Sequence, residues 1–287
     1  MTDKSNHSGN TNKRIDLHVH SSASDGTLAP AQVVKLAYDK GLSAIALTDH
    51  DTVMGVEEAM SVPLPIEVIP GIELSAGYGD GDIHILGLYV NYKSEKLIKI
   101  SEDVIKERDW RNNKMAENLA DAGIDITVDK IREIAGADGV ITRAHFARFL
   151  VENNYVRDKS EAFSKYLATD TPYFVKRRYL SPEECIRVIL ECGGIPVLAH
   201  PMLYKLPQLE LEGLISRLKS AGLAGIEAIY STYTPEEEDY VRTLAVRFKL
   251  KITGGSDFHG SNKPDINIGS GRGNLSIPYS LLSQLQE

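Results

Sequence analysis

Residues 16–21 read Asp-Leu-His-Val-His-Ser, and Ser-Asp-Gly follows at 24–26. The flanks of the first stretch alternate polar and apolar residues like a short strand. Successive side chains on a strand point to opposite faces, so His18 and His20 share one face. Two imidazoles on one face can hold a metal ion, although such a pair can also belong to a solvated strand face. Asp25 follows in a turn just past the strand end, where it can reach a second ion beside the first.

Length and composition indicate a globular enzyme. The chain has 287 residues, of which 42% are hydrophobic, and this predicts one main domain with an insertion. We expect a cytoplasmic protein without a membrane partner, because there is no apolar run of about 18 residues and no charged-then-apolar leader. The formal net charge of -8 argues against duplex DNA as a ligand, since duplex binders usually have a basic face. Cys185 and Cys192 are expected in the core, too far apart for a disulfide.

Seven apolar or alternating segments predict the strands of one sheet. They are residues 14–19, 42–48, 66–69, 82–90, 194–199, 225–230 and 251–255. Helical patterns lie between several of them, beginning with Pro30 to near Gly41, and later at residues 182–192, 208–221 and 235–248. Strands that alternate with helices imply a parallel α/β barrel. Acidic and histidine residues follow several of these strands, at the carboxyl ends where catalytic groups collect in such barrels.

The sequence predicts three parts of the chain. Residues 1–13 have almost nothing to bury and are expected to form a disordered tail. Residues 14–93 and 178–287 are expected to form the barrel. Residues 94–177 are mostly helical and break the rhythm of strands and helices. We therefore expect a small helical insertion subdomain that lies over one mouth of the barrel and caps the active site.

Six of the eight histidines fall in or just after predicted strands. Any one of them can be a hydrogen-bonded core histidine, but random placement does not produce six together with three carboxylates at strand ends. The nine candidate metal ligands are His18, His20, Asp25, His50, Glu73, His84, His200, Asp257 and His259. Imidazole and carboxylate donors without thiolate suit Mn²⁺, Fe²⁺ or Zn²⁺ in open, catalytic coordination. Three carboxylates against three divalent ions leave about +3, which suits an anionic phosphate substrate.

Four motifs resemble those of the PHP (polymerase and histidinol phosphatase) superfamily of metallophosphoesterases. They are Asp-Leu-His-Val-His-Ser at 16–21, Thr-Asp-His-Asp at 48–51, Ala-His-Pro at 199–201 and Ser-Asp-Phe-His-Gly at 256–260. The inserted Thr-Arg-Ala-His-Phe-Ala at 142–147 and the run 193–201 are most similar to the bacterial branch that includes the 3',5'-nucleotide bisphosphate phosphatases. Members of this branch are also implicated as 5'-to-3' exoribonucleases. The resemblance covers almost the whole chain.

The resemblance implies a distorted (β/α)₇ barrel with three divalent ions, Mn²⁺ first, with Zn²⁺ or Fe²⁺ as alternatives. By this resemblance, the first ion is held by His18, His20, Glu73 and Asp257, the second by Glu73, His84 and His200, and the third by Asp25, His50 and His259. The implied reaction is direct in-line hydrolysis of a phosphate monoester, with His200 and Asp257 as catalytic residues. The proton donor to the leaving alkoxide stays open between a metal-bound water and His200.

The implied substrate is a small nucleotide with a 5'-phosphate, such as pAp, which yields AMP and phosphate, or a short 5'-phosphorylated RNA. Arg143, His145 and Arg178 are the expected substrate contacts, because a guanidinium can grip a phosphate with two parallel hydrogen bonds. Asp49 and His145 are also candidates for hydrogen bonds that orient the metal ligands. The run 176–178, Lys-Arg-Arg, can equally be a solvated charge cluster.

Two other functions stay open. A histidinol-phosphate phosphatase binds a cationic amine and would need acidic groups outside the metal pocket, whereas the accessory segments of this chain offer arginines. A non-catalytic PHP regulatory module would be expected to lose ligands, whereas all nine are present here. No obligate protein partner is evident.

Overall fold

The computed structural model describes residues 13–136 and 139–287. The expected disordered tail lies outside the described residues, apart from Lys13. In the part of the chain that the structure describes, every helix is too short or too polar to cross a lipid bilayer.

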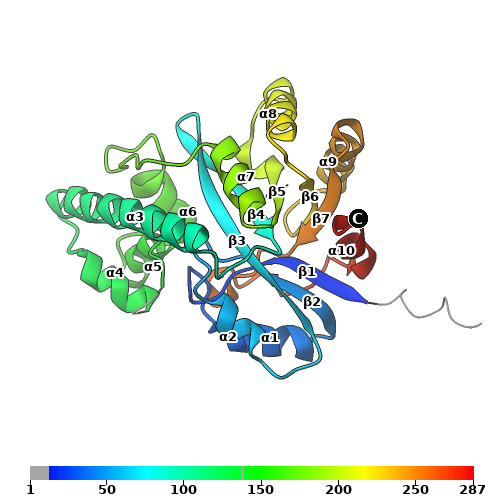
Figure 1. Ribbon diagram of the computed structural model, residues 1–287. Coiled ribbons are helices and arrows are strands. Elements are labelled where there is room, and N and C mark those ends of the chain that lie inside the picture. Colours follow the sequence, from blue (N-terminus) through cyan, green and yellow to red (C-terminus); the bar gives the residue numbers. More distant parts are fainter. Residues whose placement is uncertain (1–12, 137–138) are drawn as a thin grey trace, which may run out of the picture.

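One eight-stranded sheet forms the centre of the molecule, in the order β7-β6-β5-β4-β3-β2-β1-β8 (Figure 1). The strands are β1 (Arg14–Val19), β2 (Leu42–Leu47), β3 (Glu67–Tyr78), β4 (Gly81–Leu88), β5 (Ile195–Leu198), β6 (Gly225–Tyr230), β7 (Lys251–Gly255) and β8 (Ile277–Pro278). The short β8 pairs with the start of β1, while the residues after β7 meet its end. There the Asp257 amide donates to the His18 carbonyl at 2.8 Å, and the His20 amide donates to the Phe258 carbonyl at 3.0 Å. These bonds curl the sheet into a nearly closed barrel.

The expected α/β barrel is confirmed, but the expectation that all its strands are parallel is wrong. β4 runs antiparallel to both β3 and β5, and β8 runs antiparallel to β1. For β4 the reason is the two-residue turn Gly79-Asp80 that connects it to β3, because so short a connection can join only antiparallel strands. Gly79 has a φ of 57°, a left-handed conformation that glycine adopts readily. β3 also continues well beyond the expected end at residue 69.

Helices pack against the outside of the barrel. They are α1 (Pro30–Asp39), α2 (Val56–Met60), α7 (Pro182–Glu191), α8 (Gln208–Ser220), α9 (Pro235–Phe248) and α10 (Tyr279–Leu285), with 3₁₀ turns η2 (Pro201–Tyr204) and η3 (Gly260–Asn262). α7 and α9 each begin with proline and a capping box, Ser181 with Glu184 and Thr234 with Glu237, which satisfies amide groups at the helix start. Both cysteines are buried and free, as expected.

A mostly helical segment follows β4 and lies at one side of the barrel (Figure 1). It contains α3 (Glu95–Asp121), α4 (Val128–Ala135), α5 (Arg143–Glu152), α6 (Lys159–Ala162) and the π-helix η1 (Phe163–Leu167). These helices have a hydrophobic core of their own, which includes Met115, Phe146 and Leu150. The chain rejoins the barrel where the Gly77 amide donates to the Leu180 carbonyl at 2.9 Å. The boundaries 14–93, 94–177 and 178–287 stay a prediction.

Candidate metal centre

The structure brings all nine candidate ligands together at one mouth of the barrel. His18 and His20 lie at the end of β1, and Asp257 and His259 follow β7. His84 and Glu73 lie within the antiparallel pair β3–β4, Glu73 opposite Leu86 and Ser75 opposite His84. His18, His20, Glu73 and Asp257 are buried, whereas His50 and His84 keep 13% and 20% of their side-chain surface exposed. The centre is therefore deep and opens towards His50 and His84.

The first predicted set of ligands has the spacing of a coordination sphere. The Nε2 atoms of His18 and His20 lie 3.1 Å apart. His18 Nε2 is 3.4 Å from Glu73 Oε1 and 3.6 Å from Asp257 Oδ1. His20 Nε2 is 3.2 Å from Glu73 Oε2 and 3.3 Å from Asp257 Oδ1. Ligand atoms at about 2.1 Å from a tetrahedral ion lie roughly 3.4 Å from one another, so His18, His20 and Glu73, which form one ligand group, fit one ion, and Asp257 lies beside both imidazoles.

The remaining candidates share ligands more widely than expected. His50 joins Glu73 and His84 in one group, and it also joins His20, Asp25 and His259 in another. His200 groups with His18 and Asp257, and its Nε2 is 3.1 Å from Glu73 Oε1. Glu73 Oε1 is also 2.8 Å from His84 Nδ1. Glu73 is thus at the centre of the cluster, where its carboxylate can bridge ions.

The polar atoms of the cluster provide a test of whether ions fit. Glu73 Oε2 lies 2.9 Å from His50 Nδ1, yet neither atom makes a hydrogen bond, and His84 Nδ1 and His200 Nδ1 also lack partners. Buried polar atoms are nearly always hydrogen-bonded, so close but unbonded nitrogen and oxygen atoms indicate ligands of a cation. The donors are imidazole and carboxylate, which suit divalent transition metals in catalytic sites. The residues fit divalent ions.

Electrostatics within the cluster show the competition between protons and cations. Burial would raise the pKa of Glu73, but His50, His84 and His18 hold this pKa well below its usual value. Burial would lower the pKa of His20, but the nearby carboxylates of Asp257 and Glu73 raise it to about 9. Protons on the imidazoles thus neutralise the carboxylates when cations do not. Metal binding must release them, so metal affinity depends on pH.

Three supporting residues were not predicted from the sequence. Glu227 on β6 is fully buried, and its Oε1 lies 3.1 Å from His18 Nδ1. This contact places the His18 proton on Nδ1 and leaves Nε2 free to bind metal. On the other side, Tyr230 and Lys263 both donate to Asp257 Oδ2 at 2.5 Å, which directs Oδ1 towards the imidazoles. In the sequence, only its position as a charged residue inside the otherwise apolar strand 225–230 could have indicated a role for Glu227.

The backbone around the centre is tightly constrained. Asp51, His200 and Asp257 all have positive φ, at 55°, 25° and 56°, a conformation that non-glycine residues adopt at some cost. Gly255 lies directly against His18, because a Cβ at that position would be 2.2 Å from the His18 Cβ. Asp49, expected behind the ligands, accepts from the Ser24 hydroxyl at 2.6 Å and orders the turn that carries Asp25.

Comparison with known proteins agrees with this geometry. The sequence model of the PHP domain family matches residues 16–178. The chain belongs to the PHP domain family. It is 35% identical over 86% of its length to a 5'-3' exoribonuclease from Haemophilus influenzae, of which the match covers 90%. It is 32% identical over 89% of its length to a 3',5'-nucleoside bisphosphate phosphatase from Chromobacterium violaceum, again covering 90% of the relative. A solved amidohydrolase from Chromobacterium violaceum, with bound sulfate and no metal, has a TM-score of 0.86 and 31% identity, covering 95% of this chain and 96% of the other.

The metal centre of this PHP chain opens into a cavity of about 150 Å³. His50, His84 and Asp25 of the candidate centre line it together with four arginines from α3, α5 and the segment before α7. These are Arg108, Arg111, Arg143 and Arg177, and the other lining residues are Ser75, Asp82, Thr142, Ala144 and Phe163. Arg143 therefore lies where it was expected. Its guanidinium is 3.3 Å from Asp82 Oδ1, and 22% of its side chain is exposed. Arg108, Arg111 and Arg177 were not predicted.

The two other expected substrate contacts do not line this PHP cavity. His145 is buried, and its Nδ1 accepts from the Thr142 amide at 3.0 Å, which caps α5. Burial lowers the pKa of His145 to about 4, so its ring is neutral at pH 7. Arg178 is exposed and lines a separate hollow beside Val104 of α3. Its neighbour Arg177 is the member of the basic run that reaches the centre.

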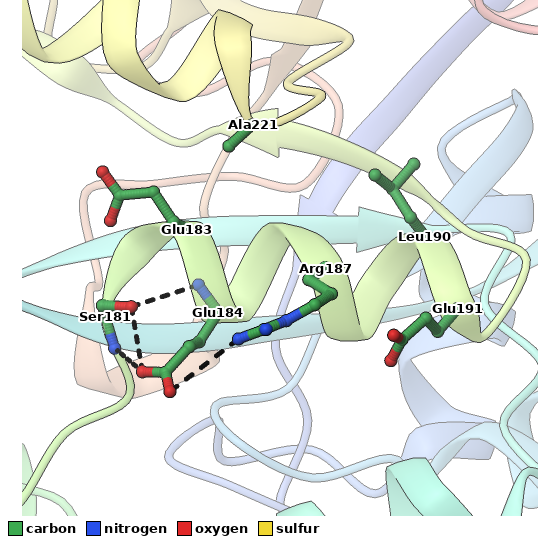
Figure 2. A pocket seen from close by; sticks show the side chains of 7 residues that line it. All are labelled: Ser181, Glu183, Glu184, Arg187, Leu190, Glu191 and Ala221. Carbon is green, nitrogen blue, oxygen red and sulfur yellow. Dashed lines mark hydrogen bonds and ion pairs between the residues drawn. The ribbon is translucent and has the colours of Figure 1, made fainter.

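A wider hollow of about 680 Å³ lies on the outer face of α7 (Figure 2). None of the nine ligands lines it, and its charged residues are Glu183, Glu184 and Glu191 with a single cation, Arg187. Glu184 is already engaged with Ser181 in the helix cap, as Figure 2 shows. An acidic surface groove of this kind does not suit an anionic substrate, so the smaller arginine-lined cavity is the candidate substrate site.

Proposed function

We propose that this protein is a metal-dependent phosphatase that hydrolyses the 5'-phosphate of nucleotides such as 3',5'-bisphosphates, converting pAp to adenosine monophosphate (the 3'-monophosphate) and phosphate. It is also proposed to act from the 5' end on short 5'-phosphorylated RNA. The observation that carries this proposal is the cluster of nine imidazole and carboxylate ligands, which opens directly into a cavity lined by four arginines. The similarity to a bisphosphate phosphatase and to exoribonucleases supports the same reaction class.

Bound divalent ions would activate water and neutralise charge on the phosphoryl oxygens. The chain's own residues hold the geometry for this chemistry. Glu73 connects the ligand groups, and Glu227 orients two histidines at once, through His18 Nδ1 and the His200 amide. Burial lowers the pKa of His200, so its ring is neutral and is a ligand rather than the proton donor. Asp257 acts as a ligand, held by Tyr230 and Lys263.

The charges of the cavity argue against the alternative of histidinol phosphate. A cationic amine would need unpaired carboxylates near the centre. The carboxylates beside the arginines, Asp51 and Asp82, are already paired with Arg108, Arg177 and Arg143. A non-catalytic module is disfavoured because the ligand cluster is complete. Three Mn²⁺ ions and a cytoplasmic location, both expected from the sequence, belong to this proposal.

Phosphate release tests the proposal directly. Protein purified with Mn²⁺ is offered pAp, AMP, 5'-phosphorylated and 5'-hydroxyl dinucleotides, and histidinol phosphate, with Asp257→Asn as the inactive control. We expect pAp and the 5'-phosphorylated dinucleotides to react and the 5'-hydroxyl dinucleotides to be inert. Fastest release from histidinol phosphate, or none from any nucleotide, would overturn the proposal. Elemental analysis of the same preparation is expected to give about three ions per chain, the number that the resemblance to the PHP superfamily implies.

A further inference from the structure

Among the residues that the structure describes, Arg111 is a buried cation without a carboxylate partner. Only 2% of its surface is exposed, and its Nε donates to Asn112 Oδ1 at 2.9 Å. Its Nη2 has no hydrogen-bond partner among the described residues. A buried unpaired guanidinium is unfavourable, because both its charge and its donors lose water without replacement. A position that keeps such a group calls for an anion that the chain itself does not supply.

The neighbouring arginines are already paired. Arg108 donates to Asp51 Oδ2 at 2.6 Å, and Arg177 lies 3.3 Å from the same oxygen. Arg143 lies 3.3 Å from Asp82. Four guanidinium groups face two carboxylates, which leaves two positive charges around the cavity, as many as the negative charges on one phosphate dianion.

The charge of Arg111 persists at neutral pH. Burial, together with the positive charges of Arg108, Arg143 and Arg177, lowers its pKa to about 9. Arg177 also offers free donors on the same cavity, since its Nε and Nη1 have no partner within residues 13–136 and 139–287. Two guanidiniums with unused N–H groups thus line one small space. Guanidinium N–H groups bind phosphate oxygens by charge-assisted hydrogen bonds.

The cavity joins this arginine pair to the metal centre, because His50, His84 and Asp25 also line it. A phosphate at the metal centre would have its charge neutralised by divalent ions, for which the nine candidate residues offer ligands. The two remaining positive charges of the arginines are then available for a second anionic group on the same substrate.

We propose that Arg111, with the free donors of Arg177, binds the second, non-hydrolysed phosphate of a nucleotide bisphosphate or the next phosphate of a short RNA. This inference rests on the proposed function and specifies its substrate class: two phosphates separated by one nucleoside. It also shifts the main anion contact from Arg143, whose charge Asp82 neutralises, to Arg111.

Selectivity between one and two phosphates tests this site. The Mn²⁺ enzyme is assayed with adenosine 3',5'-bisphosphate, 5'-AMP and 3'-AMP, as wild type, Arg111→Met and Arg178→Met. Arg178→Met is the matched control, because Arg178 lies on another hollow. For Arg111→Met we expect kcat/KM for the bisphosphate to fall about 100-fold and that for the monophosphates to change less than about threefold, since only the bisphosphate loses a charge-assisted contact. Arg111→Lys should recover part of the loss.

The opposite results are equally clear. If Arg111→Met lowers bisphosphate and monophosphate turnover alike, or leaves both unchanged, the second-phosphate site is refuted. A lower Tm of Arg111→Met would also refute it, because removal of an unpaired buried charge is expected to leave the fold as stable or more stable.

Failure of the proposed function remains distinguishable. If the wild type releases phosphate from no nucleotide, binding of the intact bisphosphate is measured by calorimetry. If Arg111→Met binds the bisphosphate at least about tenfold more weakly than the wild type does, the result supports the site. Equal binding, or no binding to the wild type, overturns it.

Discussion

Glu227→Gln should weaken metal binding without changing any ligand. The two oxygens of Glu227 serve two donors, His18 Nδ1 at 3.1 Å and the His200 amide, which lies 2.9 Å from Oε2. A glutamine has one acceptor oxygen, so its NH₂ group must face one of these donors. If it faces His18, the imidazole moves its proton to Nε2 and loses the lone pair that binds metal.

The magnitude follows from the contact that is lost. One charge-assisted hydrogen bond in a buried site contributes about 1.5–3 kcal/mol, which corresponds to roughly 10- to 100-fold in affinity. Supporting residues of metal ligands typically have effects of this size. The assay is the Mn²⁺ concentration that restores half of the activity to chelated and dialysed protein. We expect this concentration to rise by about 10- to 100-fold, with most of kcat recovered at saturation.

The control is Glu67→Gln, because Glu67 accepts hydrogen bonds from Tyr89 and Tyr279 and takes no part in the ligand groups. It should leave the Mn²⁺ requirement unchanged. If Glu227→Gln also needs no more Mn²⁺ than the wild type, then Glu227 does not orient His18, and the reasoning about its tautomer is wrong.

Three further predictions concern stability. Chelation with EDTA should lower Tm and stop phosphate release, because ions relieve the repulsion among buried carboxylates; an unchanged Tm in circular dichroism would contradict a cluster in the core. The pKa of His145 is about 4 in the fold and 6.5 ordinarily, so on acidification the unfolded chain takes up a proton first. The free energy of unfolding should therefore fall between pH 6.5 and 4, by roughly 3 kcal/mol in total. In urea melts at several pH values, His145→Gln should lose less stability over this range than the wild type. Equal dependence on pH in the two proteins would refute this. Gly255→Ala should cost about 2 kcal/mol or more and displace His18, measured as Tm and metal content, whereas Gly213→Ala, with open space around it, should leave both unchanged or raise Tm.

The sequence predicted which candidate ligands come together, because their positions depend on local pattern. A histidine that follows a parallel strand must lie at the carboxyl-terminal edge of the sheet, and residues at that edge meet whatever the details of packing. The reversed direction of β4 did not remove His84 from the centre, because the hairpin places it beside Glu73 within the same sheet. The direction of β4 depends on the length of the turn after β3, and the pattern of apolar residues does not predict that length.

Residues that act through distant contacts could not be found in the same way. Glu227 meets His18 across 209 positions of sequence, so no local pattern links them. Arg111 lies on a long charged helix, which normally indicates solvent exposure, and only the packing of α3 against the barrel shows that it is buried. In the basic run, a difference of one residue decided between Arg177, which enters the cavity, and Arg178, which does not.

Helix α3 joins two hydrophobic cores in one rigid rod. Leu97, near its start, packs in the barrel core, and Met115 and Leu119, near its end, pack in the core of the inserted helices. Its 27 residues extend about 40 Å at 1.5 Å per residue, with Arg108 and Arg111 midway. A continuous helix transmits displacement along its length instead of absorbing it. Any tilt of the inserted helices must therefore move these guanidiniums relative to the candidate metal ligands. Insertions of different size can thus change the distance between the metal centre and the arginines while the barrel stays unchanged.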